Sequence, residues 1–175
     1  MKKIIKELIP YVVIVIVVVL IRTFIITPVI VSGDSMEPTL KNKQLLLLNK
    51  INYRFNEIER FDIVVIKKKA PELETSNGSE KEIIKRIIGL PGEEIIYRSN
   101  TLYVDGHELK NDYNFDTDDF SLKTICNCTR IPEDKYLVLG DNRAVSADSR
   151  IMGLIDKDEI QGSVKLSLWP VKTVK

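Results

Sequence analysis

The sequence predicts a mainly β protein, in which a domain built on an antiparallel β-sheet follows one N-terminal transmembrane helix. An apolar run near the N-terminus is long enough to cross a bilayer. The rest of the chain alternates short β-branched or aliphatic runs with turn residues, and the hairpin dipeptide Asp105-Gly106 joins one pair of runs. A chain of 175 residues accommodates one such domain with a buried core.

The first element is the apolar run, which we expect to form a transmembrane anchor over residues 8–27. The segment from Leu8 to Ile21 contains no charged residue, and the run continues past Arg22, whose long side chain can reach the interface. The run is apolar on every side, unlike a core helix of a soluble protein. No alanine occurs before Ala70, so the small-residue cleavage site of a signal peptide is missing. We therefore expect a retained anchor whose helix ends at Pro28.

The charges on either side of the run predict its orientation. Three lysines lie among residues 1–7, whereas Arg22 is the only cation between the run and Lys41. Because cytoplasmic flanks carry the excess of positive charge, residues 1–7 are expected in the cytoplasm. Residues 28–175 then form an extracytoplasmic domain of a single-pass protein in the cell membrane.

The domain is expected to be mostly antiparallel β-structure. Its hairpin comprises residues 100–110, and the polar segment Lys67–Glu82 is expected to be a surface loop between two strands. Residues 110–135 are polar, partly acidic and weakly periodic, which predicts a small extension outside the main sheet over about residues 97–135. The strand-like runs are residues 44–51, 60–69, 81–90, 93–99 and 135–140.

Composition and cysteine spacing exclude several classes of site. The 26 basic and 25 acidic residues nearly balance, so the sequence does not predict nucleic-acid binding. Cys126 and Cys128 lack a second Cys or His pair for zinc. Free thiols are the favoured interpretation of this pair, and a local disulfide, which would close a strained ring, stays open. The acidic cluster at residues 116–119 lacks the glycine and terminal glutamate of a calcium loop, which favours a solvated loop.

A candidate nucleophile lies in the segment VSGDSMEPTL, residues 31–40. Ser35 stands there in a bend marked by glycine and proline. A serine hydroxyl is a weak nucleophile until a neighbouring base takes its proton. His107 is the only histidine, and the predicted hairpin places it on an exposed turn. A Ser-His-Asp triad is therefore not expected.

Residues 81–90, KEIIKRIIGL, offer a lysine as the base instead. In an extended strand Lys85 shares one face with two isoleucines, and Arg86 lies on the opposite face and cannot deprotonate in practice. Burial disfavours the charged form of a lysine and so makes it a general base. The strand alone favours an ordinary lysine whose ammonium reaches water, and both interpretations stay open at this point.

A third segment bears on this choice. Residues 140–150, GDNRAVSADSR, are rich in turn formers and short polar side chains and directly follow the expected core strand at 135–140. Such a segment can supply a hydroxyl that orients a neutral amine, and an Asp and an Arg that brace the site. Each of the three segments alone is weak evidence for catalysis. Together, in this order behind a membrane anchor, the three segments are a specific indication of a catalytic site.

The segments SGDSMEPTL, RFDIVVIKKK, KRIIGLPGE and GDNRAVSADSR closely resemble those of the type I signal peptidases, family S26, across nearly the whole chain. These membrane-bound Ser-Lys endopeptidases cleave signal peptides from exported preproteins after small residues at positions −1 and −3. The single anchor and small size are similar to the Gram-positive branch. The resemblance implies an enzyme without cofactor or metal, monomeric, with preproteins and the lipid bilayer as partners.

The same resemblance assigns roles to individual residues. Ser35 is implied as the nucleophile and Lys85 as the general base. Some relatives carry a serine at the position of Gly33 that supports the oxyanion hole, so here the hole would depend on main chain. The resemblance further implies that Ser146 hydrogen-bonds the lysine amine, that Asp148 and Arg150 form an ion pair, and that Asp141 and Arg143 are structural.

Substrate is expected to bind as an extended strand against exposed sheet edges, with narrow pockets for small side chains. The candidate lining residues are Val29, Val31, Met36, Leu40, Ile83 and Ile84. Two other functions compete with the preprotein peptidase. One is a homologue specialised for pilin processing or acting as a non-proteolytic partner in pilus assembly. The other is self-cleavage, as in the related Ser-Lys repressors. Those proteins are cytoplasmic and carry a DNA-binding region, whereas this sequence predicts an anchor and no such region.

Overall fold

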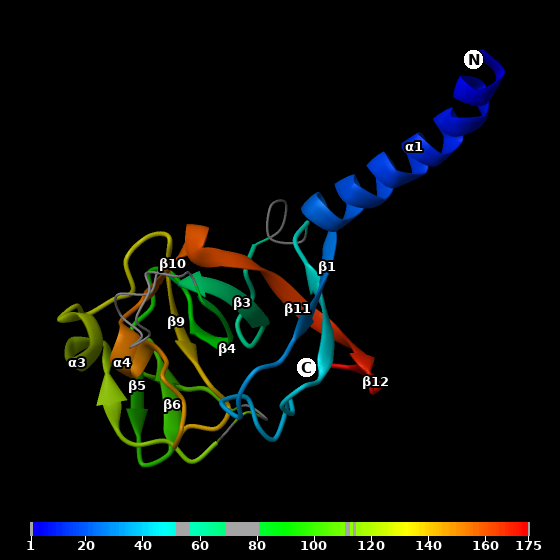
Figure 1. Ribbon diagram of the computed structural model, residues 1–175. Coiled ribbons are helices and arrows are strands. Elements are labelled where there is room, and N and C mark those ends of the chain that lie inside the picture. The colour runs from blue at the N-terminus through cyan, green and yellow to red at the C-terminus, as the bar shows by residue number, and fades with distance from the viewer. Residues whose placement is uncertain (1, 52–56, 69–80, 111–112, 114, 175) are drawn as a thin grey trace.

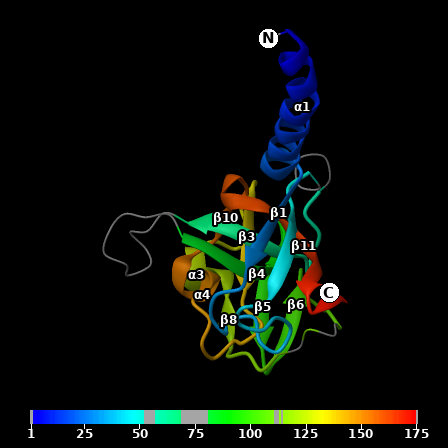
Figure 2. The same ribbon diagram turned by 45° about the vertical axis from the view of Figure 1, so that its right-hand side comes forward.

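The computed structural model describes residues 2–51, 57–68, 81–110, 113 and 115–174. It confirms the predicted fold class, an antiparallel β domain behind one N-terminal apolar helix. Helix α1, Lys2–Phe24, stands clear of the domain in both ribbon views (Figures 1 and 2). Its window Glu7–Phe24 has a mean hydropathy of 2.3, and none of that window is buried against the domain.

The end of α1 differs from the prediction. The helix stops at Phe24, and Pro28 lies inside strand β1, Ile26–Ile30. Every residue of β1 pairs with strand β2, Leu45–Asn49, so sheet formation ends the helix before the proline is reached. The last residues of the expected anchor, 26 and 27, therefore belong to the sheet.

The main sheet has eight strands among the described residues, and all of its pairings are antiparallel. Its order is β1-β2-β11-β3-β4-β9-β10, with β12 paired to β11, so β1 lies at an edge. The anchor thus enters the domain through an edge strand (Figure 1). The remaining bounds are β3 Ile63–Lys68, β4 Lys81–Gly89, β9 Lys135–Leu139, β10 Ile155–Asp156, β11 Ile160–Trp169 and β12 Val171–Thr173.

A second sheet of four strands covers much of the expected extension, in the order β7-β6-β5-β8. The predicted hairpin is present, since β6 and β7 flank Asp105 and Gly106, both of which have positive φ. The bounds are β5 Ile95–Arg98, β6 Thr101–Val104, β7 His107–Glu108, β8 Phe120–Ser121 and helix α3 Leu122–Cys126. The remaining helical segments are α4 Ser149–Met152 and the 3₁₀ turn η2 Lys157–Glu159.

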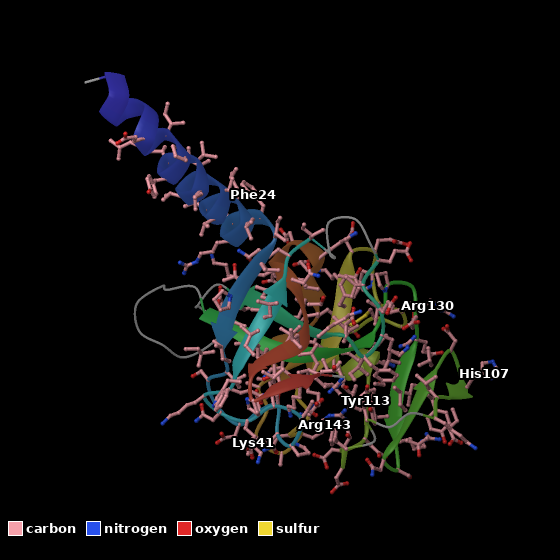
Figure 3. All side chains as sticks on the ribbon, turned by 90° about the vertical axis from the view of Figure 1, so that its right-hand side faces the viewer. Phe24, Lys41, His107, Tyr113, Arg130 and Arg143 are labelled. Carbon is pink, nitrogen blue, oxygen red and sulfur yellow. A yellow bond between two sulfur atoms is a disulfide. The ribbon has the colours of Figure 1, made fainter. Side chains whose placement is uncertain are left out.

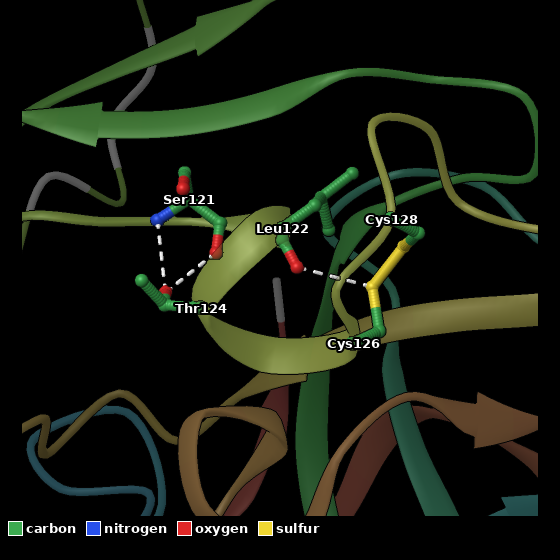
Figure 4. Close-up of a disulfide and its surroundings, with 5 residues drawn as sticks. All are labelled: Ser121, Leu122, Thr124, Cys126 and Cys128. Atoms are coloured by element: carbon green, nitrogen blue, oxygen red, sulfur yellow. Dashed lines mark hydrogen bonds between the residues drawn. A yellow bond between two sulfur atoms is a disulfide. The ribbon is translucent and has the colours of Figure 1, made fainter.

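Cys126 and Cys128 are joined in a disulfide at the end of α3 (Figure 4), so the favoured free-thiol interpretation is wrong. Thr124 closes the other end of the same helix, because its hydroxyl donates to the Ser121 carbonyl at 2.7 Å. The two cysteines pack beside a core cluster that includes Leu122. The segment from 121 to 128 is therefore held at its start by a hydrogen bond and at its end by the disulfide.

The core lies on both faces of the main sheet, which explains the uninterrupted apolar run in β3. Ile63 and Val65 point into one cluster, and Val64 and Ile66 point into another on the opposite face. Strands β3 and β4 end at Lys68 and begin at Lys81, so most of the expected surface loop lies outside the described residues.

Candidate active site

Ser35 lies in the turn that connects β1 to β2. The amide of Glu37 donates to the Asp34 carbonyl at 3.1 Å, which closes a tight turn around the serine. Met36 and Leu40 flank it and are both fully buried. Their side chains pack in the core cluster on the same face of the main sheet as Ile63 and Val65 and so anchor the turn. Ser35 itself stays half-buried and presents its hydroxyl to a surface groove.

Lys85 reaches Ser35 from the middle of β4. Its Nζ lies 2.8 Å from the Ser35 Oγ, within hydrogen-bonding distance, and the residue is only 3% exposed. The interpretation of Lys85 as a lysine extended into water is therefore wrong. His107 is exposed in the hairpin of the second sheet, as Figure 3 shows, and takes no part in this contact.

The segment 140–150 packs directly against the nucleophile turn. The Asn142 amide donates to the Ser35 carbonyl at 3.0 Å, and its side-chain Nδ2 donates to the Asp34 carbonyl at 3.2 Å. Gly140 is essential to this close approach, since a Cβ at that position would overlap the Ser35 carbonyl oxygen and the side chain of Ser146. The three sequence segments therefore meet at one place.

Asp148 and Arg150 form the expected ion pair. The Arg150 Nε donates to Asp148 Oδ1 at 2.9 Å, and the carboxylate is fully buried. The hydrogen bond to Asp148 is the main cause that raises the pKa of Arg150. Asp148 Oδ2 also accepts from the Gly140 amide at 3.0 Å, and Arg150 Nη2 donates to the Arg143 carbonyl at 2.7 Å. The pair thus fixes both ends of the loop that contacts Ser35.

Ser146 departs from its expected role. Its side chain is 4% exposed and lies against Gly140, but among the described residues its Oγ makes no hydrogen bond. The expected bond to the Lys85 amine is therefore absent from this structure. The Lys85 amine instead lies in contact with Ser35.

A second buried ion pair was not foreseen from the sequence. Arg86, whose side chain is buried, donates from Nε and Nη2 to both carboxylate oxygens of Asp141, at 2.8 and 2.6 Å. Its guanidinium also donates to the Phe61 carbonyl at 2.9 Å and lies 4.0 Å from the ring centroid of Tyr113. The pair joins β4 to the start of the 140–150 loop. Alternation along a strand hinted that Arg86 faces away from Lys85, but nothing local identified its partner.

Arg143 is also buried and holds the same loop from the other side. Its Nε donates to the Gly140 carbonyl at 3.0 Å, and its Nη1 donates to the Thr117 hydroxyl. The guanidinium lies 5.3 Å from the ring centroid of Tyr97. Asp141 and Arg143 thus both occupy structural positions around the loop, in agreement with expectation.

The groove beside Ser35 has a volume of about 570 Å³. Val29, Ile83 and Ile84 line it, as expected. The other three candidates do not, because strand alternation and the turn direct them into the core cluster: these are Val31, Met36 and Leu40. Gly33 also lines the groove, and its amide is bonded to Asn42 Oδ1 at 3.3 Å. Residues not foreseen include Ile30, Ser32, Val65, Glu82, Asn142, Val145 and Ala147.

Two strand edges border this groove. One is β1, the edge strand of the main sheet, and the other is the first half of β4, residues 81–85. Strand β9 pairs with β4 only from Arg86 onward, so residues 81–85 have a partner on one side alone among the described strands. An extended peptide can therefore add to either edge. Within the described part of the chain, no group of His, Cys, Asp and Glu is arranged to hold a metal ion.

The chain is similar in sequence to a known family of proteins. The sequence model of the family described as "Signal peptidase, peptidase S26" matches residues 3–169. Signal peptidase IB of Staphylococcus aureus (strain COL) is 34% identical, over 99% of this chain and 94% of its own length. Signal peptidase I of Bacillus caldolyticus is 37% identical, over 93% of this chain and 90% of its own.

A crystal structure of a signal peptidase I from Enterococcus faecalis V583 is similar to the fold as well. It superposes with a TM-score of 0.52 at 37% sequence identity, and covers 62% of this chain and 97% of that one. The sequence comparisons thus extend over nearly the full length of the chain, and the structural comparison extends over 62% of it. The chain belongs to the signal peptidases of peptidase family S26.

Proposed function

We propose that this protein is a membrane-bound serine endopeptidase that removes signal peptides from exported preproteins with Ser35 as nucleophile and Lys85 as general base. The observation that carries this proposal is the 2.8 Å contact between the Lys85 Nζ and the Ser35 Oγ. That distance suits a proton transfer between the two groups. Burial of the amine disfavours its charged form, which is what a base at neutral pH requires.

The reaction follows from these positions. Neutral Lys85 accepts the Ser35 hydroxyl proton as Oγ attacks the scissile carbonyl, and the resulting ammonium returns the proton to the leaving amine. The acyl-enzyme formed on Ser35 is then hydrolysed by a water that the same amine deprotonates. Asp148 and Arg150 support this chemistry by fixing the loop behind the nucleophile.

The Ser35 amide is the proposed donor to the oxyanion. Among the described residues it donates to no acceptor, whereas the Gly33 amide is already bonded to Asn42. Glycine at position 33 provides no side-chain donor, so this amide carries more of the oxyanion stabilisation than it would beside a serine. Removing one oxyanion donor typically lowers kcat by about 100- to 1,000-fold.

We propose that the substrate lies as a strand between the edges of β1 and β4. Val29, Ile83 and Ile84 line the groove between these edges, and we propose that they form narrow pockets for small side chains. This supports cleavage after small residues at positions −1 and −3. Backbone hydrogen bonds to the two edges then supply most of the affinity and the pockets supply specificity.

Membrane association is supported by α1 and by exposed apolar side chains at the end of β1 farther from the helix. Ile30 and Trp169 are 68% and 75% exposed, and both pair with Leu45 on either side of β2. Val171 in the neighbouring β12 is 76% exposed. We propose that α1 spans the membrane with its N-terminus in the cytoplasm, and that this apolar surface rests on the outer leaflet. Enzyme and preprotein then share one surface, which raises their effective concentration.

Trp169 is the only tryptophan and reports on that contact directly. In the full chain reconstituted into vesicles, we expect brominated lipids to quench its fluorescence, because the indole lies at the lipid interface. The double variant Trp169→Phe/His107→Trp moves the indole to the exposed hairpin of the second sheet and should escape quenching. Equal quenching of both proteins would contradict the proposed surface.

The test of the proposed function is cleavage of a preprotein with an A-x-A site by the purified full chain. We expect a single cut after the second alanine, absent with Ser35→Ala. A protein that binds the preprotein or a pilin without cutting it would instead support the non-proteolytic assembly role. The contact between Ser35 and Lys85 disfavours that role, since a binding partner has no need of it.

A further inference from the structure

We propose that Asn142 is the positioning residue of the oxyanion hole, holding the peptide whose N–H stabilises the transition state. This inference rests on the proposed function, because it concerns the same nucleophile and the same groove. Asn142 makes a hydrogen bond to each of the two peptide groups that flank Ser35. Its side-chain Nδ2 donates to the Asp34 carbonyl at 3.2 Å, and its amide donates to the Ser35 carbonyl at 3.0 Å.

The direction of the bond from the Asn142 side chain to the Asp34 carbonyl determines how it orients the Ser35 N–H. The Asp34–Ser35 peptide is trans, so its carbonyl and its N–H point in opposite directions. A donor on the Asp34 carbonyl therefore turns the Ser35 N–H away from Asn142. Asn142 lines the groove, but its Nδ2 is directed to the Asp34 carbonyl, on the opposite side of that peptide from the Ser35 N–H. Its role is to fix the plane of the donating peptide.

Polarisation adds to this orientation. A hydrogen bond accepted by a peptide carbonyl strengthens the N–H of the same peptide as a donor. The Asp34 carbonyl also accepts from the Glu37 amide at 3.1 Å, but that bond lies within the turn and moves with it. The Asn142 side chain is the link from this carbonyl to a separate element. Because Asp148, Arg150 and Arg143 hold that element, the peptide is fixed relative to the rigid loop.

The structure separates this role from two others. Lys85 approaches the Ser35 hydroxyl and not the peptide, so loss of the Asn142 side chain leaves the base in place. Substitution to alanine also leaves the bond from residue 142's own amide to the Ser35 carbonyl. A variant at this position thus removes one defined contact to the oxyanion peptide and retains the rest of the site.

The experiment compares Asn142→Ala and Asn142→Asp with the wild type on an A-x-A peptide. We expect kcat to fall about tenfold in the alanine variant with KM unchanged, since the N–H that this hydrogen bond orients stabilises the oxyanion of the transition state alone. The aspartate variant should fall further, because a carboxylate repels the Asp34 carbonyl. The acid limb of the pH–rate profile should keep its position, because Lys85 is untouched.

A second measurement separates positioning from a general loss of structure. A peptide aldehyde forms a hemiacetal with Ser35 whose oxygen occupies the oxyanion hole, so its affinity should fall by the same factor as kcat/KM. The affinity for the cleaved peptide product should not change. Asn49→Ala serves as a control, because the Asn49 side chain also bonds the main chain, accepting from the Ile51 amide at 3.1 Å, but does not line the groove.

Four outcomes would overturn the inference. Wild-type kcat in Asn142→Ala would exclude a positioning role, and a raised KM with unchanged kcat would make Asn142 a substrate contact. A fall in unfolding temperature with equal losses of aldehyde and product affinity would make it merely structural. Absence of cleavage by the wild type, in contrast, would refute the proposed function and remove the basis of this inference with it.

Discussion

Ser35→Ala, Lys85→Ala and Lys85→Arg should each lower the rate of preprotein cleavage by about 10⁴-fold or more while the fold persists. Removing the nucleophile or the base of a catalytic serine site leaves only the contribution of substrate binding and the oxyanion hole. The arginine variant is the sharpest of the three. It retains a long cationic side chain at position 85, but a guanidinium does not deprotonate and cannot accept the Ser35 proton.

Measurement of kcat/KM on an A-x-A preprotein, beside circular dichroism and thermal unfolding, checks this expectation. Lys68→Ala is the matched control, because Lys68 is a strand lysine only 7% exposed whose Nζ lies 3.3 Å from the Glu159 carboxylate. We expect that variant to lose stability and to retain its cleavage rate. Turnover of Lys85→Arg at the wild-type rate would show that Lys85 is not the base.

Gly140→Ala should be the most damaging substitution outside the dyad. A methyl group there overlaps the Ser35 carbonyl and the Ser146 side chain, so the loop or the nucleophile turn must shift. Overpacking of this kind costs about 1–3 kcal/mol of unfolding free energy. A displacement of about 1 Å in the nucleophile can lower the rate by about 100-fold. We therefore expect a folded protein with cleavage reduced on the order of 100-fold.

The combination Gly140→Ala/Ser146→Gly tests the cause. Removing the Ser146 side chain relieves part of the overlap and leaves the overlap with the Ser35 carbonyl. The double variant should therefore regain stability, as measured by chemical unfolding, but only part of its cleavage rate. Stability and rate that are no better than in Gly140→Ala alone would point to a backbone effect of the alanine and not to crowding.

The sequence was sufficient to select Ser35 and Lys85 as candidates, which the structure places in contact, because the short segments that contain them carry recognisable chemical requirements when taken together. The hairpin at Asp105-Gly106 was predictable for the same reason, since its dipeptide dictates the local backbone. The Asp148–Arg150 pair is also local, being formed by residues two positions apart. Features of this kind depend on neighbours along the chain, which a sequence displays.

Features that depend on tertiary contacts were missed or misplaced. The pair between Arg86 and Asp141 joins residues 55 positions apart and leaves no local signature. Met36 was expected in the groove, but the turn around Ser35 directs it into the core. Pro28 was expected to end the anchor helix, but pairing of β1 with β2 ends it at Phe24. The hydroxyl of Ser146 was expected on the lysine, but the packing around Gly140 leaves it without a hydrogen bond among the described residues.

The proposed mechanism depends most on the protonation state of the Lys85 amine, which titration of the folded protein can measure directly. Nuclear magnetic resonance of the Lys85 side chain, in full-length protein labelled at its lysines, follows its protonation across the pH range of turnover. We predict that Lys85 loses its proton with the same midpoint as the acid limb of kcat/KM for preprotein cleavage. A Lys85 that stays protonated into the alkaline range, while cleavage proceeds at its full rate near neutrality, would contradict the account.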